Sequence, residues 1–184
     1  MKAIRTIRDL LARMPADGEV RHALRQFNMA PKAGGKVPSV KALAVKLGFD
    51  VELCDLPRGV SGRLVTDPFS ENGYRIEVNR NDDRLKQRWT VLHEIAHYFL
   101  HSRGLDPFAP EPHRAGTGHF YLQHEEVQER EANAFVAALV FGDGALEAAV
   151  SLHGEDPNIL STHFGFSPLA VSIALRQIGT APTK

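Results

Sequence analysis

The chain has 184 residues, the length of one domain of ordinary size with a substantial core. Hydrophobic residues make up 43% of the sequence and charged residues 24%, a composition that is typical of globular proteins and excludes long disordered regions. Lysine plus arginine and aspartate plus glutamate number 22 each, so the overall charge does not attract the chain to nucleic acid, an anionic membrane or an acidic substrate.

Cysteine content and hydropathy set further limits. The single cysteine, Cys54, cannot form an internal disulfide, and its apolar neighbours predict a buried, unreactive thiol on a strand near the core. The N-terminal run Met-Lys-Ala-Ile-Arg-Thr-Ile-Arg-Asp lacks the apolar core of a signal peptide. The longest apolar stretch, residues 134–141, is too short to span a bilayer. We therefore expect a cytoplasmic protein with no membrane partner.

The N-terminal part of the chain is predicted to be helical. Residues 3–27 carry apolar side chains at helical spacing on both sides of an Ala-Asp-Gly break, which predicts a pair of helices. Residues 31–38 contain glycines and prolines typical of a loop, and Ser39 then caps a helix that ends at Gly48. We assign residues 1–36 to an N-terminal helical segment.

A small sheet is predicted next, because three short extended runs are separated by Pro-Arg-Gly and Asn-Gly turn signals. The runs cover residues 50–54, 62–66 and 74–79. They predict a mainly antiparallel sheet.

Helical spacing returns after the sheet. Apolar residues recur at i, i+3, i+4, i+7 and i+8 over residues 85–101, which predicts an amphipathic helix. A loop over 103–123, a helix over 124–141 and shorter helices over 144–153 and 157–178 follow. We place the core domain at residues 37–142 and a C-terminal helical segment, packed on it, at residues 143–184.

The amphipathic helix carries the motif His93-Glu94-Ile95-Ala96-His97. Two histidines four positions apart project from one helix face, so both imidazoles can reach one metal ion roughly 2.0 to 2.1 Å away. Glu94 points off that axis, which suits a general base that contacts the metal-bound water. Zinc proteases carry this motif on a helix preceded by a sheet. We therefore predict an α+β, zincin-like metalloprotease domain with Zn²⁺ as its cofactor and additional N- and C-terminal helices.

A catalytic zinc site needs a third protein ligand. His101 continues the series, but a straight helix places it roughly 6 Å further along the axis, out of reach. On the next helix Glu129 and Asn133 share one face, so Glu129 can bind zinc while Asn133 steadies a ligating histidine. Spacing leaves Glu131 open as a competitor, because this helix is apolar nearly all round beyond Ala132, and a loop histidine is the third alternative.

Two segments together resemble the ImmA/IrrE family of metallopeptidases. They are residues 88–101, Arg-Trp-Thr-Val-Leu-His-Glu-Ile-Ala-His-Tyr-Phe-Leu-His, and residues 129–139, Glu-Arg-Glu-Ala-Asn-Ala-Phe-Val-Ala-Ala-Leu. The resemblance covers roughly residues 37–178. It implies Glu129 as the third ligand, beside His93 and His97. One departure is Leu-Val-Phe-Gly at residues 139–142, where the family usually has Leu-Leu-Met-Pro.

The resemblance also implies a function. Members of this family are bacterial or phage zinc proteases that cleave helix-turn-helix repressors, often encoded nearby, and thereby induce stress-response, mobile-element or phage genes. The implied reaction is hydrolysis of a peptide bond by metal-activated water, and the implied partner is a repressor of that kind.

Weaker signals concern substrate binding. His113, His119, Tyr121 or His124 from the loop could stabilise the oxyanion, although each is more simply a solvated side chain. The strand at residues 74–79 could hold an extended substrate through an exposed edge, or could simply cover the helix.

The alternative is a non-enzymatic regulator with a structural or vestigial metal site, for which DNA is one candidate partner. Residues 160–179 have the rhythm of a helix-turn-helix, with Ser167 capping and Pro168 at the first helical position. The second helix of this pair offers only Arg176 as a cation, so we do not expect direct nucleic-acid binding. Glu94 favours the enzyme, because a structural site needs no base beside its ligand.

Overall fold

The computed structural model describes residues 6–14, 16–29, 37–102 and 123–179. These residues form eight α-helices and three strands, which confirms the predicted α+β class. In chain order the elements are α1 (Ile7–Arg13), α2 (Gly18–Met29), α3 (Val40–Lys46), β1 (Asp50–Cys54), β2 (Gly62–Thr66), β3 (Tyr74–Asn79), α4 (Arg84–His97), a π-helical turn (Tyr98–Ser102), α5 (Gln123–Phe141), α6 (Ala145–His153), α7 (Pro157–Phe164) and α8 (Pro168–Gly179).

Most boundaries follow from local signals. Thr6, Ser39 and Asp83 each accept a bond from a backbone N–H of the first turn of α1, α3 and α4. The predicted helix over residues 85–101 differs in its last turn, where the chain widens into the π-helical turn. The division of the chain at residues 36 and 142 stays a prediction.

The sheet is mixed, with strand order β1-β3-β2. β2 pairs with β3 antiparallel, as predicted, whereas β1 pairs with β3 parallel. β3 is therefore the central strand, and the prediction that it offers an exposed edge to substrate is wrong, because both its neighbours are paired to it. Among the described strands, β1 and β2 are the two outer ones.

The two faces of the sheet differ in polarity. Ile76 and Val78 of β3 are fully buried and point to the helices. Glu77 points to the opposite face, where Arg63 and Arg75 both bond its carboxylate, at 2.7 and 2.9 Å. Cys54 lies on this polar face and is only half-buried, so the prediction of a buried thiol is wrong. The reason is that β1 is an edge strand, with exposed residues on either side of Cys54.

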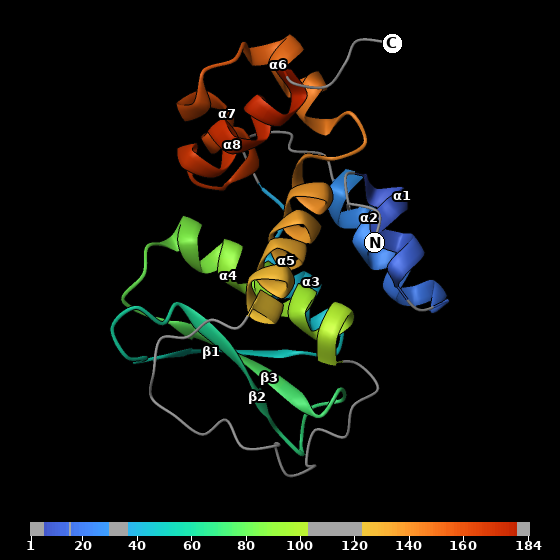
Figure 1. Ribbon diagram of the computed structural model, residues 1–184, viewed down its shortest axis with the longest axis vertical. Coiled ribbons are helices and arrows are strands. Elements are labelled where there is room, and N and C mark those ends of the chain that lie inside the picture. The colour runs from blue at the N-terminus through green and yellow to red at the C-terminus, as the bar shows by residue number, and fades with distance from the viewer. Residues whose placement is uncertain (1–5, 15, 30–36, 103–122, 180–184) are drawn as a thin grey trace.

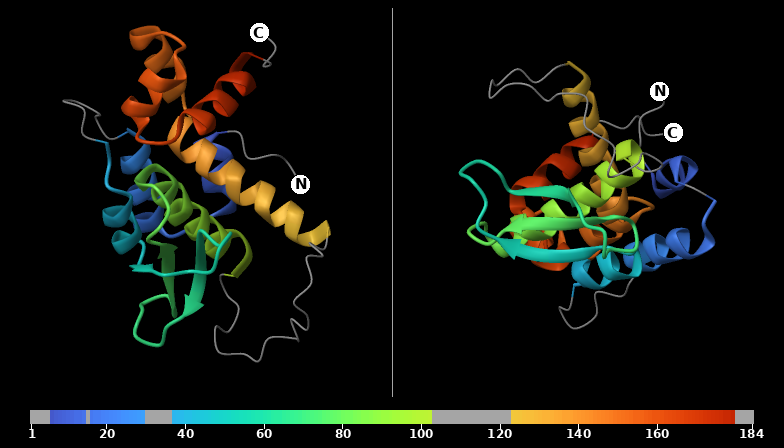
Figure 2. Two further views of the ribbon diagram at one scale, coloured as in Figure 1. Left: turned by 90° about the vertical axis from the view of Figure 1, so that its left-hand side faces the viewer. Right: turned by 90° about the horizontal axis from the view of Figure 1, so that it is seen from below.

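Helix α4 lies between the sheet and α5 (Figure 1), and it contacts β2, β3, α3 and α5. From below, the sheet lies in front of this helix (Figure 2). The close approach of α4 to β2 requires a glycine. A Cβ on Gly62 would lie 2.3 Å from the Thr90 methyl group of α4 and 3.0 Å from the backbone oxygen of Glu77. Gly62 therefore determines how near α4 can come to the sheet.

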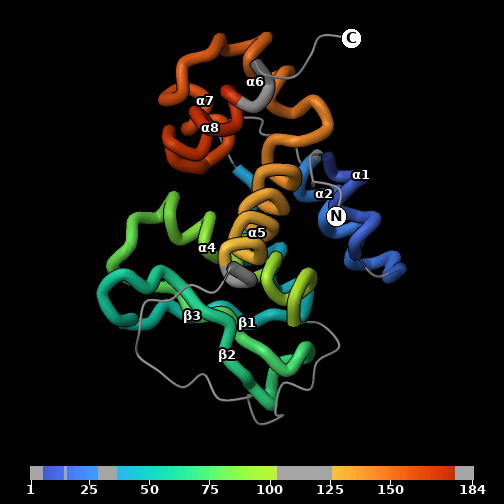
Figure 3. The backbone as a smooth tube through the Cα atoms, in the orientation of Figure 1, coloured from blue at the N-terminus to red at the C-terminus, as the bar shows by residue number. Residues whose placement is uncertain are grey.

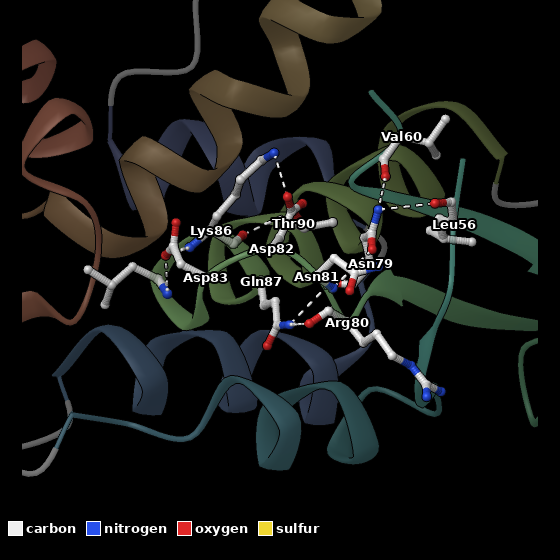
Figure 4. Close-up of polar contacts among 11 residues, drawn as sticks. Leu56, Val60, Asn79, Arg80, Asn81, Asp82, Asp83, Lys86, Gln87 and Thr90 are labelled. Atoms are coloured by element: carbon white, nitrogen blue, oxygen red, sulfur yellow. Dashed lines mark hydrogen bonds and ion pairs between the residues drawn. The ribbon is translucent and has the colours of Figure 1, made fainter. Parts of the chain in front are cut away.

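The connection from β3 to α4 is fixed by side-chain bonds (Figure 4). The Asn79 amide donates to the backbone oxygens of Val60 and Leu56, which holds the β1–β2 connection beside the end of β3. Lys86 donates to Asp82 at 2.8 Å. These bonds place the loop before β2 next to the first turns of α4.

The C-terminal helices α6, α7 and α8 lie at the end of the molecule away from the sheet (Figure 3). Arg88 of α4 ties their turn to the rest of the chain. Its guanidinium donates to the backbone oxygens of Gly165, at 2.8 Å, and Pro38, at 3.0 Å, and stacks over the Phe166 ring. One cation thus joins α4, the segment before α3 and the α7–α8 turn.

Among the described residues no single helix is long and apolar enough to cross a membrane. Two bent helix pairs reach the length and composition of a membrane span only when the two helices of a pair are counted as one. These pairs are Glu126–Phe141 with Ala145–His153, and Pro157–Phe164 with Pro168–Arg176.

Replacing Arg88 with alanine should lower the free energy of unfolding by about 2 to 4 kcal/mol, because the backbone oxygens of the buried Gly165 and the half-buried Pro38 lose their charged donor. Urea unfolding measures this change. The matched control is Arg84→Ala on the same helix, where an exposed side chain is removed and the change should stay within about 0.5 kcal/mol. Equal losses in both variants would contradict the role given to Arg88.

Candidate metal centre

Three predicted metal ligands come together in the structure. Nε2 of His93 and Nε2 of His97, both on α4, lie 2.9 Å apart. The carboxylate of Glu129, from α5, reaches both rings, with Oε2 3.1 Å from His93 Nε2 and Oε1 3.0 Å from His97 Nε2. The ligand atoms of these three residues therefore converge on one point between the two helices.

The donor set fits a divalent cation. In a tetrahedral zinc site with bonds of about 2.0 to 2.1 Å, neighbouring ligand atoms lie roughly 3.3 Å apart, so the distances found here need open by only a few tenths of an ångström. Two imidazole nitrogens and one carboxylate oxygen leave one tetrahedral position for water or substrate.

Both histidines are held in the neutral state that metal binding needs. Burial lowers the pKa of His93, and the neighbouring Glu129 carboxylate only partly opposes this. Burial also lowers the pKa of His97, and the nearby His93 lowers it further.

Glu94 lies beside the three ligands without being one of them. Its side chain is buried, and burial together with the charge of Glu129 raises its pKa to about 7, while a bond from the backbone N–H of Leu64 acts in the opposite direction. A carboxylate in this environment is a strong base when ionised and releases its proton near neutral pH.

Asn133, predicted to steady a histidine, also bonds to two other groups. Its Nδ2 donates to the backbone oxygen of Glu129 at 2.9 Å, and its Oδ1 accepts a bond from the indole of Trp89 at 3.2 Å. The Asn133 side chain interacts with His93 as well, where it favours the protonated ring. The Trp89 contact could not be foreseen from the sequence, because residues 44 positions apart share no local pattern.

Two other candidates among the described residues, Glu131 and His101, are not part of this three-residue group. Glu131 accepts a bond from Arg13 of α1 at 3.0 Å and is not part of the three-residue group. His101 lies in the π-helical turn and contacts the His97 ring, with centroids 5.4 Å apart, but does not join the group either. His113, His119 and Tyr121 lie outside the described residues, and of His124 only the backbone is described.

A second group of donor atoms lies on the polar face of the sheet and consists of Glu52, Cys54 and Glu77. Glu77 is already bonded to Arg63 and Arg75, so its charge is compensated. We therefore assign the candidate metal centre to the group on α4 and α5.

The metal centre opens into a cleft of about 840 Å³. One wall is the loop at residues 59–62, the floor is the face of α4 that carries Lys86, Trp89 and Thr90, and the other wall is α5. His93, Glu94 and Glu129 all line it. The arrangement can bring a bound molecule within reach of both the metal ligands and Glu94.

Replacing Glu94 with glutamine should change how the stability of the metal-free protein depends on pH. The pKa of Glu94 is raised from 4.5 to about 7 on folding. Its protonated form therefore stabilises the fold below pH 4.5, and this contribution is lost as the pH rises to 7. Relative to Glu94→Gln, the wild type should lose about 3 kcal/mol of unfolding free energy across that window.

Urea unfolding in the presence of a chelator, at several pH values from 4.5 to 8, measures the difference. Both proteins keep the histidines, so the histidine titrations cancel. Glu155→Gln, at an exposed position, is the matched control. A constant gap between wild type and Glu94→Gln at every pH would show that the folded state does not hold the proton on Glu94.

Comparison with known proteins agrees with this geometry. The family model described as the IrrE N-terminal-like domain (Peptidase_M78) matches residues 45–176, well over half of the chain. This segment includes α4 with the histidine motif and α5 with Glu129. A search of curated proteins found no match. The resemblance noted in the sequence is confirmed, and the chain belongs to the Peptidase_M78 family, the peptidases with an IrrE N-terminal-like domain.

Proposed function

We propose that the protein is a zinc-dependent endopeptidase, with His93, His97 and Glu129 as metal ligands and Glu94 as general base. The observation that carries this proposal is the convergence of three ligand atoms beside a buried carboxylate, at the wall of a cleft, in a chain of a peptidase family.

Each residue of the centre has a separate task. A zinc ion bound at this centre supplies Lewis acidity to a water molecule and to the peptide carbonyl. Glu94 accepts a proton from the attacking water and delivers it to the leaving amine. The position of Glu94 favours this role, because its buried side chain lines the cleft beside the metal ligands, where a general base lies close to the attacking water. The cleft aligns the scissile bond with both groups.

We propose a helix-turn-helix transcriptional repressor as the substrate, so that cleavage induces stress-response, mobile-element or phage genes. This part rests on the resemblance in sequence. It places the activity in the cytoplasm, where such a repressor acts. The cleft along α4 can accept a polypeptide segment, since it extends from the metal ligands to Lys86 near the start of that helix.

The alternative, a non-enzymatic regulator with a structural or vestigial metal site and DNA as one candidate partner, has less support. Helix α8 exposes Leu169 and Ile173, which are 67% and 48% exposed, together with the single cation Arg176. Such a face lacks the several cations that bind DNA phosphates. A structural metal site would also have no use for Glu94, whose burial as a charged carboxylate costs stability.

Elemental analysis of the purified protein tests the metal centre. We expect about one zinc per chain in the wild type and in Glu94→Gln, and none in Glu129→Ala, because only the last loses a ligand. The matched control is Glu131→Ala, two residues away on the same helix, which removes the bond to Arg13 and should retain zinc. Loss of zinc in Glu131→Ala with retention in Glu129→Ala would reverse the assignment of the third ligand.

Mapping of new protein N-termini tests the reaction. Cells that express the wild type should contain repressor fragments that are absent from cells expressing Glu94→Gln. Removal of a general base lowers the rate by about 10² to 10⁴ while leaving the ligands in place. Identical sets of N-termini in both cultures, with zinc bound in both proteins, would refute the endopeptidase and leave a binding role for the metal centre.

A further inference from the structure

We propose that Trp89 is a positioning residue for the metal centre, which holds Glu129 in place through Asn133. This inference rests on the proposed function, because it concerns the affinity of the three ligands for zinc. It adds a residue that is not itself a metal ligand.

A hydrogen-bonded bridge joins the two helices that supply the ligands. The indole Nε1–H of Trp89, on α4, donates to Oδ1 of Asn133, on α5, at 3.2 Å. Nδ2 of Asn133 in turn donates to the backbone oxygen of Glu129 at 2.9 Å. An indole N–H can only donate, so it requires the oxygen of the amide to face α4 and the nitrogen to face Glu129. Trp89 thereby fixes which way the amide is turned.

The indole itself is held firmly. Its ring packs edge-on against Phe166 in the α7–α8 turn, with ring centroids 6.0 Å apart. The neighbouring Arg88 stacks over the same phenyl ring and bonds the backbone oxygen of Gly165. The C-terminal turn therefore sets the orientation of Trp89, and Trp89 passes this constraint to α5.

Glu129 is the ligand that needs such support. Its side chain is 46% exposed, whereas those of His93 and His97 are 15% and 19% exposed. Its carboxylate bonds to the two histidines. It is the one ligand of the three that α5 supplies, so any shift of that helix against α4 changes the distances within the centre. A bond between the helices one turn from Glu129 opposes that shift.

Zinc affinity measured by competition with a chromogenic chelator tests the proposal. Trp89→Phe keeps an aromatic ring against Phe166 and removes the donor, and Asn133→Ala removes the relay together with the interaction of Asn133 with His93. Each single variant should raise the dissociation constant for zinc by about 10-fold or more, the lower end of the effect of groups that orient metal ligands. The double variant should bind zinc no more weakly than Asn133→Ala alone, because Trp89 acts through Asn133.

Tyr98→Phe is the matched control. It also removes one polar atom from an aromatic residue next to the motif, and that hydroxyl donates to Asn72, in the connection between β2 and β3. Its zinc affinity should equal that of the wild type. Urea unfolding of each metal-free variant accompanies the titrations. If Trp89→Phe merely destabilised the fold, its unfolding free energy would fall, and its loss of zinc affinity would add to that of Asn133→Ala in the double variant.

A second readout is independent of zinc. The chain has one tryptophan, so its NMR spectrum contains a single indole N–H resonance. In the metal-free protein, Asn133→Ala should shift this resonance and speed its exchange with solvent. Three outcomes would each overturn the proposal while leaving the endopeptidase intact. The indole resonance could stay unchanged in Asn133→Ala, or Trp89→Phe could bind zinc as tightly as the wild type. The third is that Trp89→Phe lowers zinc affinity by the same factor in the wild type and in Asn133→Ala. A wild type that binds no zinc would overturn both.

Discussion

Helix α4 is enclosed on most of its surface, and this enclosure is the constraint on which the rest of the structure depends. β2 and β3 cover it from one side, α5 packs against another, and the α7–α8 turn closes on Arg88 and Trp89. Leu92 and Ile95 are completely buried as a result. One strip remains open to the cleft, and the metal-binding motif lies on it. The packing of apolar residues thus decides where the polar chemistry can take place.

The enclosure has an electrostatic cost. His93, His97 and Glu94 meet beside the Glu129 carboxylate in a space where burial disfavours the charged forms of the two imidazoles and of Glu94. The folded chain responds by keeping the rings neutral and by holding a proton on Glu94 until near neutral pH. A divalent cation in this position would compensate both carboxylates. The centre therefore resembles other functional sites in trading stability of the empty protein for a prepared arrangement of ligands.

Much of the fold could be predicted from the sequence, because its local signals are strong. The three strands have the predicted bounds, since proline, glycine and asparagine mark the turns between them. The order of the strands could not be read, because hydrophobic patterns do not say which strand is central. The burial of Cys54 was wrongly predicted for the same reason: its apolar neighbours suggested a core strand, whereas β1 is an edge.

The candidate site, like the fold, could be predicted from the sequence only in part. The helical spacing of His93 and His97 is enough to place both on one helix face. The choice between Glu129 and Glu131 could not be made from spacing, because α5 is apolar nearly all round beyond both residues. Arg13 bonds to Glu131 from 118 positions away, and no local pattern reveals a contact of that separation. Gly62 has no signal in the sequence, because its importance lies in the approach of another helix and not in its own strand.

The origin of the three ligands on two helices has a thermodynamic consequence. His97 ends α4 and Glu129 lies in the next helix, so a metal ion held by both would cross-link the chain across the intervening segment, much as a disulfide does. Binding to the folded chain alone raises its stability by mass action, by about 4 kcal/mol when free metal exceeds the dissociation constant a thousandfold. The lifetime of the folded protein in the cell would then follow the supply of metal, so that scarcity removes the protein as well as its activity.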